Sequence, residues 1–475
     1  MKKTLRCIIF LTLLSNFMFA QPFAAVQTID ASAGTDPYEF ASGDLDGDGD
    51  IDLVMATYDF NGGTPAQDYI RWYKNDGNGN FTIQTDVSTT IQYVDGLTVA
   101  DIDGQYGLDI IATSANQDKL VYFLSNAAEG FDPEVVIDGA LIGPGEVVAG
   151  DINMDGNIDI ATISFSNSRT QWYSGDGAGN FTAEADIESG TANSTLYINL
   201  ADLDGDTDLD AVVTYYGDQS IEIFYNQYIE SGSTAVTWIK DTVTVESSST
   251  ATSFIFNVIT GDVNNDGNLN IIAVDNFSGD VTWYEKVKNG SSTPHAISDD
   301  SIIDRPAVAV VADINNDGEN DVLLTDGGSA DDAIIWFQGA DNASPSTTPQ
   351  LVADNNFQMY DFTVDDYDGD GDKDIASIGF FNDTVFWYEN ELITLDVPEF
   401  AIEELILYPN PAQTHISIKG SFNDALNISI LNTLGQEVMN TEVINNEPLD
   451  ISKLNTGLYM IKFETYGVTY KFVKE

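Results

Sequence analysis

The sequence predicts an all-β protein, a seven-bladed β-propeller with Ca²⁺-binding hairpin loops followed by a small C-terminal β-sandwich. Three observations predict this fold class. An acidic loop motif recurs seven times at intervals of 50 to 60 residues, an aromatic pair follows each copy, and about the last 70 residues lack both patterns. A repeat period near 50 residues that supplies four short strands each time is typical of propellers.

The acidic motif is clearest between Asp44 and Asp52. Carboxylates or carboxamides stand at positions 1, 3, 5 and 9, a glycine stands at position 6, and an apolar strand-like run follows. A hard divalent cation such as Ca²⁺ prefers six to eight oxygen ligands, which alternate side chains of a short loop can provide. Position 12 is Met55 rather than the bidentate glutamate of an EF-hand, so we expect each loop to begin a β-hairpin.

Four of the seven copies, numbered loop 1 to loop 7 in chain order, keep the whole motif. Thr207 replaces the glycine of loop 4, Asn270 the last aspartate of loop 5, and Gln105 stands at position 5 of loop 2. We therefore expect four to seven Ca²⁺ sites, with weak or no binding in those three loops. The predicted ligands of the complete loops 1, 3, 6 and 7 are Asp44, Asp46, Asp48, Asp52; Asp151, Asn153, Asp155, Asp159; Asp313, Asn315, Asp317, Asp321; and Asp366, Asp368, Asp370, Asp374. Those of loops 2, 4 and 5 are Asp101, Asp103, Asp109; Asp202, Asp204, Asp206, Asp210; and Asp262, Asn264, Asp266.

An aromatic pair lies 13 to 20 residues beyond position 9 of each loop, and five of the six tryptophans belong to these pairs. Reuse of the largest apolar side chain at one phase indicates a core position between neighbouring blades. The seventh copy lacks a strand after its pair, so we expect the strand at 24–29 to complete the last blade. The pairs are Trp72-Tyr73, Tyr122-Phe123, Trp172-Tyr173, Phe224-Tyr225, Trp283-Tyr284, Trp336-Phe337 and Trp387-Tyr388.

These acidic hairpins followed by apolar strands resemble the FG-GAP/VCBS-type repeats of integrin-like propellers. The resemblance covers roughly residues 24–390. It implies that the loops bind Ca²⁺, and it implies no single activity.

The remaining sequence predicts export. Lys2, Lys3 and Arg6 precede a short apolar run, which is typical of a signal peptide at 1–20 that is removed after Ala20. The predicted propeller spans 21–390 and a linker spans 391–404. The only cysteine, Cys7, lies in the signal peptide, so we expect no disulfide.

Residues 405–475 alternate apolar and polar side chains and contain no acidic loop, which favours a β-sandwich. The stretch Leu407-Tyr408-Pro409-Asn410-Pro411, with Gly457-Leu458-Tyr459 and the basic end at Lys471 and Lys474, resembles the type A sorting domain of the type IX secretion system. This resemblance implies a Gram-negative host and contact with the outer-membrane secretion machinery. The alternative is an ordinary appended binding sandwich.

The formal net charge of −60 argues against nucleic-acid binding. Such a surface repels phosphate backbones, so we expect no nucleic-acid partner. No apolar run beyond the signal peptide reaches the length of a membrane span.

We find no catalytic signature. Only His295 and His415 are available, and both are predicted outside repeated positions, His295 in a linker. The face opposite the acidic loops should carry several aromatic rings with arginines, which suits stacking on sugars or anchoring a protein. The predicted ligand-face residues are Tyr58, Phe60, Phe165, Arg169, Tyr216, Phe277, Arg305 and Phe381.

The sequence therefore favours a secreted or cell-surface calcium-binding propeller that binds an extracellular carbohydrate or protein without catalysis. Two alternatives remain open at this point. One is a polysaccharide-degrading enzyme, such as a lyase, on the same scaffold. The other is a structural surface-layer protein.

Overall fold

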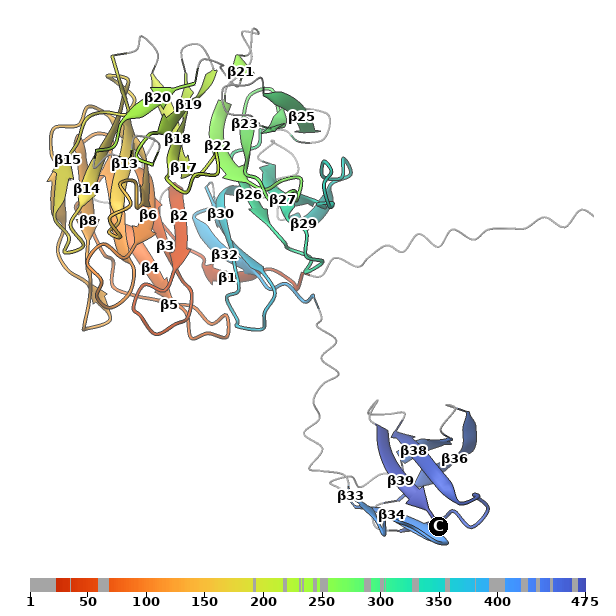
Figure 1. Ribbon diagram of the computed structural model, residues 1–475. Coiled ribbons are helices and arrows are strands. Elements are labelled where there is room, and N and C mark those ends of the chain that lie inside the picture. Colours follow the sequence, from red (N-terminus) through yellow and green to blue (C-terminus); the bar gives the residue numbers. More distant parts are fainter. Residues whose placement is uncertain are drawn as a thin grey trace, which may run out of the picture. The chain divides into compact units, whose positions relative to one another are not determined.

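In a computed structural model, the chain forms two compact units, Met1–Leu392 and Ile393–Glu475, and each is described by itself (Figure 1). The described residues form strands and turns, and none of them forms a helix long and apolar enough to cross a membrane. The structure describes residues 23–34, 36–58, 68–190, 194–216, 220–229, 232, 235–241, 246–247, 255–285, 292–299, 303, 305–326, 333–354, 359–380, 382–392, 406–419, 426–432, 436–444, 447–463 and 469–475.

The described part of the first unit contains seven antiparallel sheets of four or five strands. The first three consist of β2 (Pro37–Gly43), β3 (Asp52–Thr57), β4 (Ile70–Lys74) and β5 (Thr82–Ile83); β6 (Val94–Ala100), β7 (Asp109–Ser114), β8 (Lys119–Phe123) and β11 (Val135–Asp138); and β12 (Pro144–Gly150), β13 (Asp159–Ser164), β14 (Arg169–Gly175), β15 (Phe181–Ala183) and β16 (Glu188–Ser189). A separate small hairpin consists of β9 (Ser125–Asn126) and β10 (Gly130–Phe131).

The other four sheets repeat this order of strands. They consist of β17 (Thr195–Ala201), β18 (Asp210–Tyr215), β19 (Ser220–Asn226), β20 (Trp238–Lys240) and β21 (Glu246–Ser247); β22 (Ile255–Gly261), β23 (Asn270–Asp275), β24 (Val281–Glu285) and β25 (Thr293–Ser298); β26 (Ala309–Ala312), β27 (Asp321–Asp326), β28 (Ala333–Phe337) and β29 (Gln350–Asp354); and β30 (Met359–Asp365), β31 (Asp374–Gly379), β32 (Thr384–Tyr388) and β1 (Gln27–Asp30).

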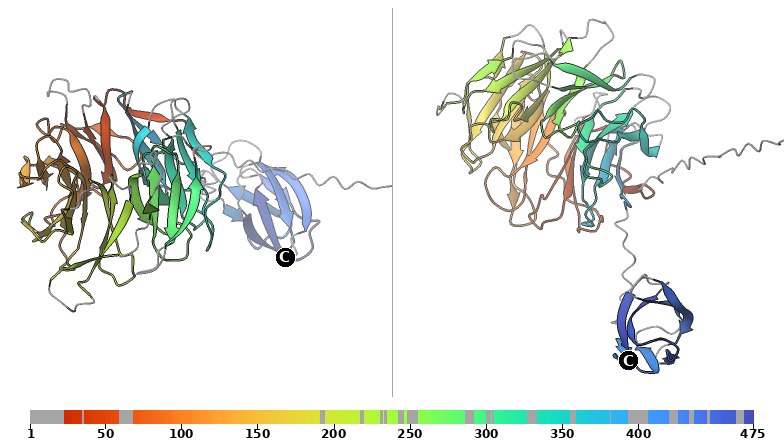
Figure 2. Two further views of the ribbon diagram at one scale, coloured as in Figure 1. Left: turned by 90° about the horizontal axis from the view of Figure 1, so that it is seen from above. Right: turned by 45° about the vertical axis from the view of Figure 1, so that its right-hand side comes forward.

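The first strands of the seven sheets, here called the inner strands, follow one another in a ring (Figures 1 and 2). Each of β2, β6, β12, β17, β22, β26 and β30 contacts the next, and β30 contacts β2. The last sheet is completed by the N-terminal strand, as the sequence predicts. Gln27 on β1 pairs with Trp387 on β32, in antiparallel order. The first unit is therefore all-β and propeller-like.

Hydrophobic clusters between neighbouring sheets hold the ring together, as shown by Trp72 packing with Leu97 and Ile110 of the next sheet. Five tryptophans occupy one register position, each paired with the residue two places after position 9, and all are at most 5% exposed. The fourth predicted pair differs. Phe224 pairs with Ala211, one place out of phase, and Ile223 takes the tryptophan position.

The second unit is a small two-sheet fold, in agreement with the predicted sandwich. One sheet contains β33 (Ile406–Tyr408), β34 (His415–Lys419) and β37 (Pro448–Asp450), and the other contains β36 (Glu437–Val443), β35 (Leu426–Leu431), β38 (Gly457–Phe463) and β39 (Thr469–Lys474). Apolar side chains of both sheets form a single hydrophobic core within the second unit, which includes Ile416, Ile430 and Phe472. Its core is therefore independent of the first unit.

Candidate functional site

The acidic loops connect the first and second strands of the seven sheets and share one backbone form. The carboxylate at position 1 accepts hydrogen bonds from amides within its own loop, as when Asp44 accepts from Gly47 (2.8 Å) and Gly49 (3.0 Å). Positions 4 and 6 both adopt positive φ, 77° and 99° for these two glycines. Thr207 adopts φ 86° at position 6 of loop 4 and still donates to Asp202 (3.0 Å), so the loop keeps its form with a strained residue.

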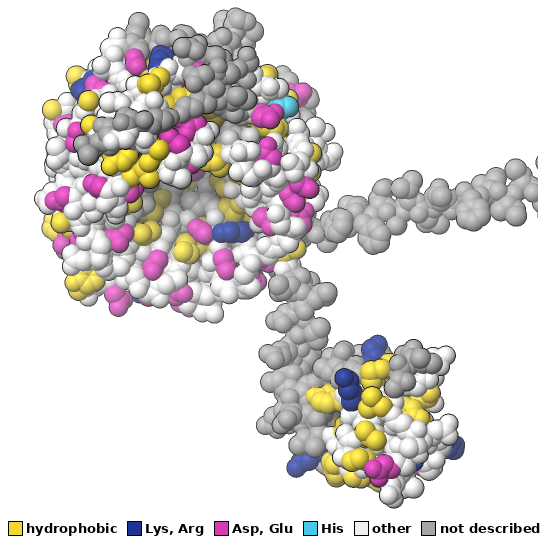
Figure 3. All heavy atoms as spheres, in the orientation of Figure 1, with side chains coloured by type: hydrophobic (Ala, Val, Ile, Leu, Met, Phe, Trp, Pro, Cys, Tyr) yellow, Lys and Arg dark blue, Asp and Glu magenta, His cyan; other side chains and the backbone are white. Residues whose placement is uncertain are grey.

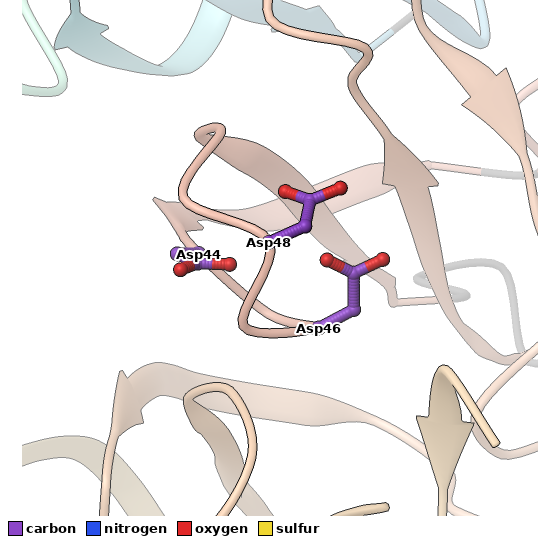
Figure 4. A group of neighbouring side chains, drawn as sticks. All are labelled: Asp44, Asp46 and Asp48. Carbon is purple, nitrogen blue, oxygen red and sulfur yellow. The ribbon is translucent and has the colours of Figure 1, made fainter. Parts of the chain in front are cut away.

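Four loops bring three carboxylates together, with one oxygen of each within 4.8 Å of the others. Figure 4 shows the three side chains of loop 1 on one side of the loop. Loops 3, 5 and 6 carry Asn at position 3, where a carboxamide oxygen stands in place of a carboxylate. Loop 4 groups positions 1, 3 and 5 as loop 1 does, and loop 2 groups positions 1, 3 and 9 as loop 7 does. The arrangement of carboxylates therefore does not distinguish loops 2 and 4 from the loops predicted to bind strongly. The groups are Asp44, Asp46, Asp48; Asp101, Asp103, Asp109; Asp202, Asp204, Asp206; and Asp366, Asp368, Asp374.

The aspartate at position 9 has a structural role that the motif alone did not reveal. Asp374 is fully buried, and its two oxygens accept hydrogen bonds from Tyr367 N (3.1 Å) and Asn390 N (2.7 Å). These bonds tie the start of the loop to the end of the third strand. Corresponding pairs of bonds are made by Asp52, Asp109, Asp159, Asp210 and Asp321.

Burial raises the pKa of these position 9 carboxyls, against the backbone hydrogen bonds that lower it. The pKa rises to about 7 for Asp374 and to about 8 for Asp210. In loop 5, the amide oxygen of Asn270 keeps the first of the two bonds, from Val263 N (2.9 Å). The substitution that removes a charge from loop 5 therefore retains part of the clamp.

Buried oxygens without partners indicate that the loops suit a cation. Oδ1 of Asp46 and Oδ1 of Asn264, both at position 3, are buried and accept no hydrogen bond from the described residues. Asp372, at position 7 of loop 7, is 2% exposed and has neither oxygen bonded. Burial and the four neighbouring loop aspartates raise its pKa to about 7. A divalent cation supplies the missing charge and coordination at such oxygens.

Asp372 is therefore a candidate ligand that sequence reasoning missed, because the predicted side-chain ligands were taken from positions 1, 3, 5 and 9 alone. A signal was present in the sequence. Position 7 is an aspartate in loops 1, 4 and 7, as Asp50, Asp208 and Asp372.

Loop 1 differs from the others by an ammonium group. Lys74 Nζ forms ion pairs with Asp46, with Asp48 (3.2 Å) and with Glu129 (3.2 Å). Lys74 ends β4, one residue before the amide that the position 9 clamp holds. The corresponding residue of the sixth sheet, Gln338, donates to Asp317 at position 5 of loop 6 (3.0 Å). This register position therefore lies over the loops, and in loop 1 it provides an internal cation.

The turns between third and fourth strands lie beside the loops, on what we call the loop face. A Cβ on Gly77 would lie 2.4 Å from Asp50 Oδ1, and one on Gly177 would lie 2.3 Å from Asn157 Oδ1. The opposite end of the inner strands defines the opposite face.

Aromatic rings gather on the opposite face. The Tyr58 ring lies 5.0 Å from that of Tyr38 and 4.9 Å from that of Tyr93. Phe165 and Tyr216, 40% and 48% exposed, have ring centroids 6.1 Å apart. Of the predicted ligand-face aromatics, Phe165 and Tyr216 thus lie together, and Tyr58 lies with Tyr38 and Tyr93, which were not predicted.

The remaining predicted ligand-face residues are less uniform. Phe277 is 64% exposed. Arg169 forms a two-fold hydrogen-bonded ion pair with Asp186 (2.8 and 2.7 Å), so its charge is already matched. Arg305 is exposed, and its carbonyl accepts a hydrogen bond from Asn276. Phe60 and Phe381 lie outside the described residues.

His295 was predicted in a linker, and that was wrong. It lies in β25, and its ring stacks on that of Trp283 with centroids 4.2 Å apart. The β-prone residues that follow it allow the segment to pair with β24. His295 lies on the outer strand β25, and its Nε2 is 3.9 Å from a carboxylate oxygen of Glu285.

The comparisons with known proteins agree with both resemblances. Residues 44–105, 151–213 and 262–324 match the model of an FG-GAP-like repeat, and residues 406–475 match a secretion system C-terminal sorting domain. The chain is thus a protein of FG-GAP-like repeats with a type IX sorting domain, and this domain implies export to the medium or the cell surface.

Similar solved structures are distant. A protein from Lactobacillus plantarum has a TM-score of 0.48 and 11% identity, over 84% of this chain and 97% of that chain. The periplasmic gluconolactonase of Pseudomonas aeruginosa has a TM-score of 0.42 and 14% identity, over 64% of this chain and 86% of that chain. No curated protein matches the sequence.

Proposed function

We propose that this chain is a calcium-stabilised, seven-bladed propeller that binds an extracellular carbohydrate or protein on its opposite face. The observation that carries the binding role is the grouping of aromatic rings there, with Phe165, Tyr216 and Phe277 each at least 40% exposed. Exposed rings grouped on one face are costly to solvate and suit stacking on sugars or anchoring a protein. The sorting domain supports a place outside the cell for this interaction.

Calcium binding in the loops is part of the proposal. Positions 1, 3 and 5 would hold the ion, with position 9 beside them and Asp372 added in loop 7. The ion would supply positive charge, and the loop oxygens would coordinate it. The unpartnered oxygens of Asp46, Asn264 and Asp372 support this assignment.

The ligand proposal can be tested on a glycan array and by pull-down of extracellular proteins, with the purified secreted protein in calcium. We expect Tyr216→Ala and Phe277→Ala to weaken the binding that the native protein shows. Ile239→Ala is a matched control, because Ile239 is 53% exposed on an outer strand. Equal loss in all three variants would place the ligand elsewhere, and release of shortened glycan products would favour the lyase alternative.

Export can be tested separately by deleting residues 405–475. We expect the first unit to fold and to accumulate in the periplasm, because the two units have separate cores. Arrival of the truncated protein in the medium would contradict the sorting role.

A further inference from the structure

A cavity of about 170 Å³ lies between the inner strands, apart from the acidic loops. We call it the channel cavity. Figure 3 shows a hollow at the centre of the first unit, with hydrophobic, acidic and basic side chains around it. Its lining includes Glu39, Glu146, Asn257 and Asp361, and it also includes the rings of Tyr38 and Tyr197.

Four carboxylates gather on one side of this space. Asp361, Glu39, Asp95 and Glu146 lie on β30, β2, β6 and β12, which are consecutive in the ring. Burial, followed by the neighbouring carboxylates, raises the pKa of Glu146 to about 8 and that of Glu39 well above its ordinary value. Burial raises the pKa of Asp95 to about 7, and it raises that of Asp361 to about 7 against backbone hydrogen bonds from Phe362 and Phe40 that lower it.

The lysine near this channel is engaged elsewhere. Lys373 pairs with Asp365 (3.4 Å), four residues along β30 from Asp361. Four strand residues span about 13 Å, so this ammonium does not neutralise the channel carboxylates. No ion pair of the described residues neutralises these four carboxyl groups, so their raised pKa values keep them largely protonated at neutral pH, and a cation in the cavity would favour their ionised form.

A second, independent observation comes from the other side of the cavity. Asn257, on β22, is 9% exposed, and its buried Oδ1 accepts no hydrogen bond from the described residues. A buried carboxamide oxygen without a donor has lost its hydration without compensation, so a ligand that brings an N–H group there is favoured. The cavity therefore offers an unused acceptor as well as carboxyl groups that a cation would ionise.

The spacing argues against a metal ion. Among the described residues, three acidic side chains with oxygens within 4.8 Å of one another occur only in the loops, and the channel carboxylates are not among them. The remaining lining is aromatic or aliphatic, including Phe40, Leu97 and Phe256. A cation carried on an apolar chain suits such a site better than a bare ion, because ammonium groups also favour ring faces.

The acidic part of the channel cavity lies toward the opposite face. Glu39 and Asp361 are each the third residue of their strands, whereas the acidic loops follow the last residue. Tyr38 lines the cavity, and its ring lies 5.0 Å from that of Tyr58 on the opposite face. The channel cavity is thus continuous with the proposed ligand surface.

We infer that the channel cavity binds a primary ammonium group on an aliphatic chain, such as a lysine side chain of a protein partner or a free polyamine. The carboxylates of Glu39, Glu146 and Asp361 match its charge, Asn257 Oδ1 accepts one N–H, and the apolar wall packs on its methylene groups. This inference rests on the proposed binding function and names the chemistry that its ligand carries.

The test is calorimetric titration of the purified secreted protein, saturated with calcium, with Nα-acetyl-lysine amide and with putrescine. We expect both probes to bind, and Glu146→Gln and Asp361→Asn each to weaken binding at least tenfold. Glu184→Gln is the matched control, because the Glu184 carboxylate is exposed near the outer strand β15. The affinity of this variant for both probes should equal that of the native protein. Nα,Nε-diacetyl-lysine amide, which keeps the chain and lacks the charge, should not bind.

Equal affinity for the charged and the acetylated probe would overturn the inference, as would equal loss in all three variants. Loss of one calcium ion on Glu146→Gln would mean that the cavity is a metal site, and would also overturn it. Tighter binding of a lysine-containing peptide than of putrescine would support a protein as the source. Glycan or protein binding in the array and pull-down, with no binding of either ammonium probe, would sink the ammonium inference alone and leave the proposed function intact.

Discussion

The two ends of the inner strands carry acidic groups of different kinds. At the loop face, the acidic motif recurs in every sheet. Position 1 accepts from backbone amides of its own loop, and position 9 accepts from amides at the start of the loop and after the third strand, as in loop 7. At the opposite end, one register position holds a different residue from sheet to sheet, such as Glu39, Glu146, Tyr197, Asn257 and Asp361. What every blade needs in order to fold is repeated, and what one ligand needs is not.

Calcium withdrawal should give the largest effect, and it tests the loop side of this comparison. Extracellular sites with dissociation constants around 0.1–1 mM each add roughly 1–2 kcal/mol at a few mM Ca²⁺, so four sites contribute about 4–8 kcal/mol. We expect chelation at neutral pH to lower the melting temperature of the first unit sharply and to leave the second unit unchanged. High NaCl should recover part of the loss by screening.

Scanning calorimetry with calcium and with chelator measures this directly. Superimposable curves under the two conditions would mean that the loops are solvated turns, and the calcium proposal would fail.

The second prediction separates the clamp from the ion within loop 7. Asp374→Ala leaves two buried backbone amides, of Tyr367 and Asn390, without acceptors and should cost roughly 2–5 kcal/mol whether or not calcium is present. Asp370→Ala removes an exposed loop carboxylate and should lower stability only in calcium. Chemical denaturation of both variants, with and without chelator, distinguishes the two roles. Unchanged stability of Asp374→Ala in chelator, where no ion contributes, would contradict the clamp.

These differences also show what the sequence could predict. A motif that recurs seven times identifies its own loops, strands and phase, and it predicted the closure by β1. The residue type at the register position of the channel carboxylates differs between sheets, so no sequence pattern identifies these carboxylates. Lys74 lies 26 residues after Asp48 and reaches it only because β4 pairs with β3. His295 was misplaced because a Pro-His segment after small polar residues is also typical of a linker.

The third prediction concerns pH and the opposite end of the strands. The pKa values of Asp95 and Asp361 rise to about 7 and that of Glu146 to about 8, so the folded protein binds more protons than the unfolded chain above about pH 4. The stability that these groups contribute is therefore complete below about pH 4, and it is lost progressively as the pH rises to between 7 and 8. Glu39 shifts in the same direction, and Tyr58, whose pKa rises to about 12, stays neutral.

With calcium saturating, we expect the first unit to lose on the order of 1–3 kcal/mol between pH 5.5 and 8.5. Glu146→Gln and Asp361→Asn should each flatten this dependence, because the neutral amide does not titrate. Glu184→Gln serves as the control. Melting curves across this pH range provide the measurement, and a native slope in both channel variants would show that other groups cause it.

The smallest effect should come from Lys74, whose ammonium group pairs with carboxylates of loop 1, a pairing that no other loop shows among the described residues. Its ammonium group pairs with Asp46 and Asp48, the residues at positions 3 and 5, so an arriving calcium ion must first displace it. The side chain of Asp46 is almost fully buried, and removal of Lys74 leaves the charge of Asp46 unmatched, which favours a bound cation.

Lys74→Met keeps the aliphatic stem and should strengthen calcium binding at loop 1 about tenfold, a gain of roughly 1.4 kcal/mol at one site. Lys119→Met is the matched control, since Lys119 pairs with Glu134 (2.7 Å) rather than with a loop. Calcium titration of the chelated protein, with Asp48→Ala used to identify the contribution of loop 1, measures the change. Unchanged affinity in Lys74→Met would mean that the ammonium does not compete, and loop 1 would then rank with loop 7.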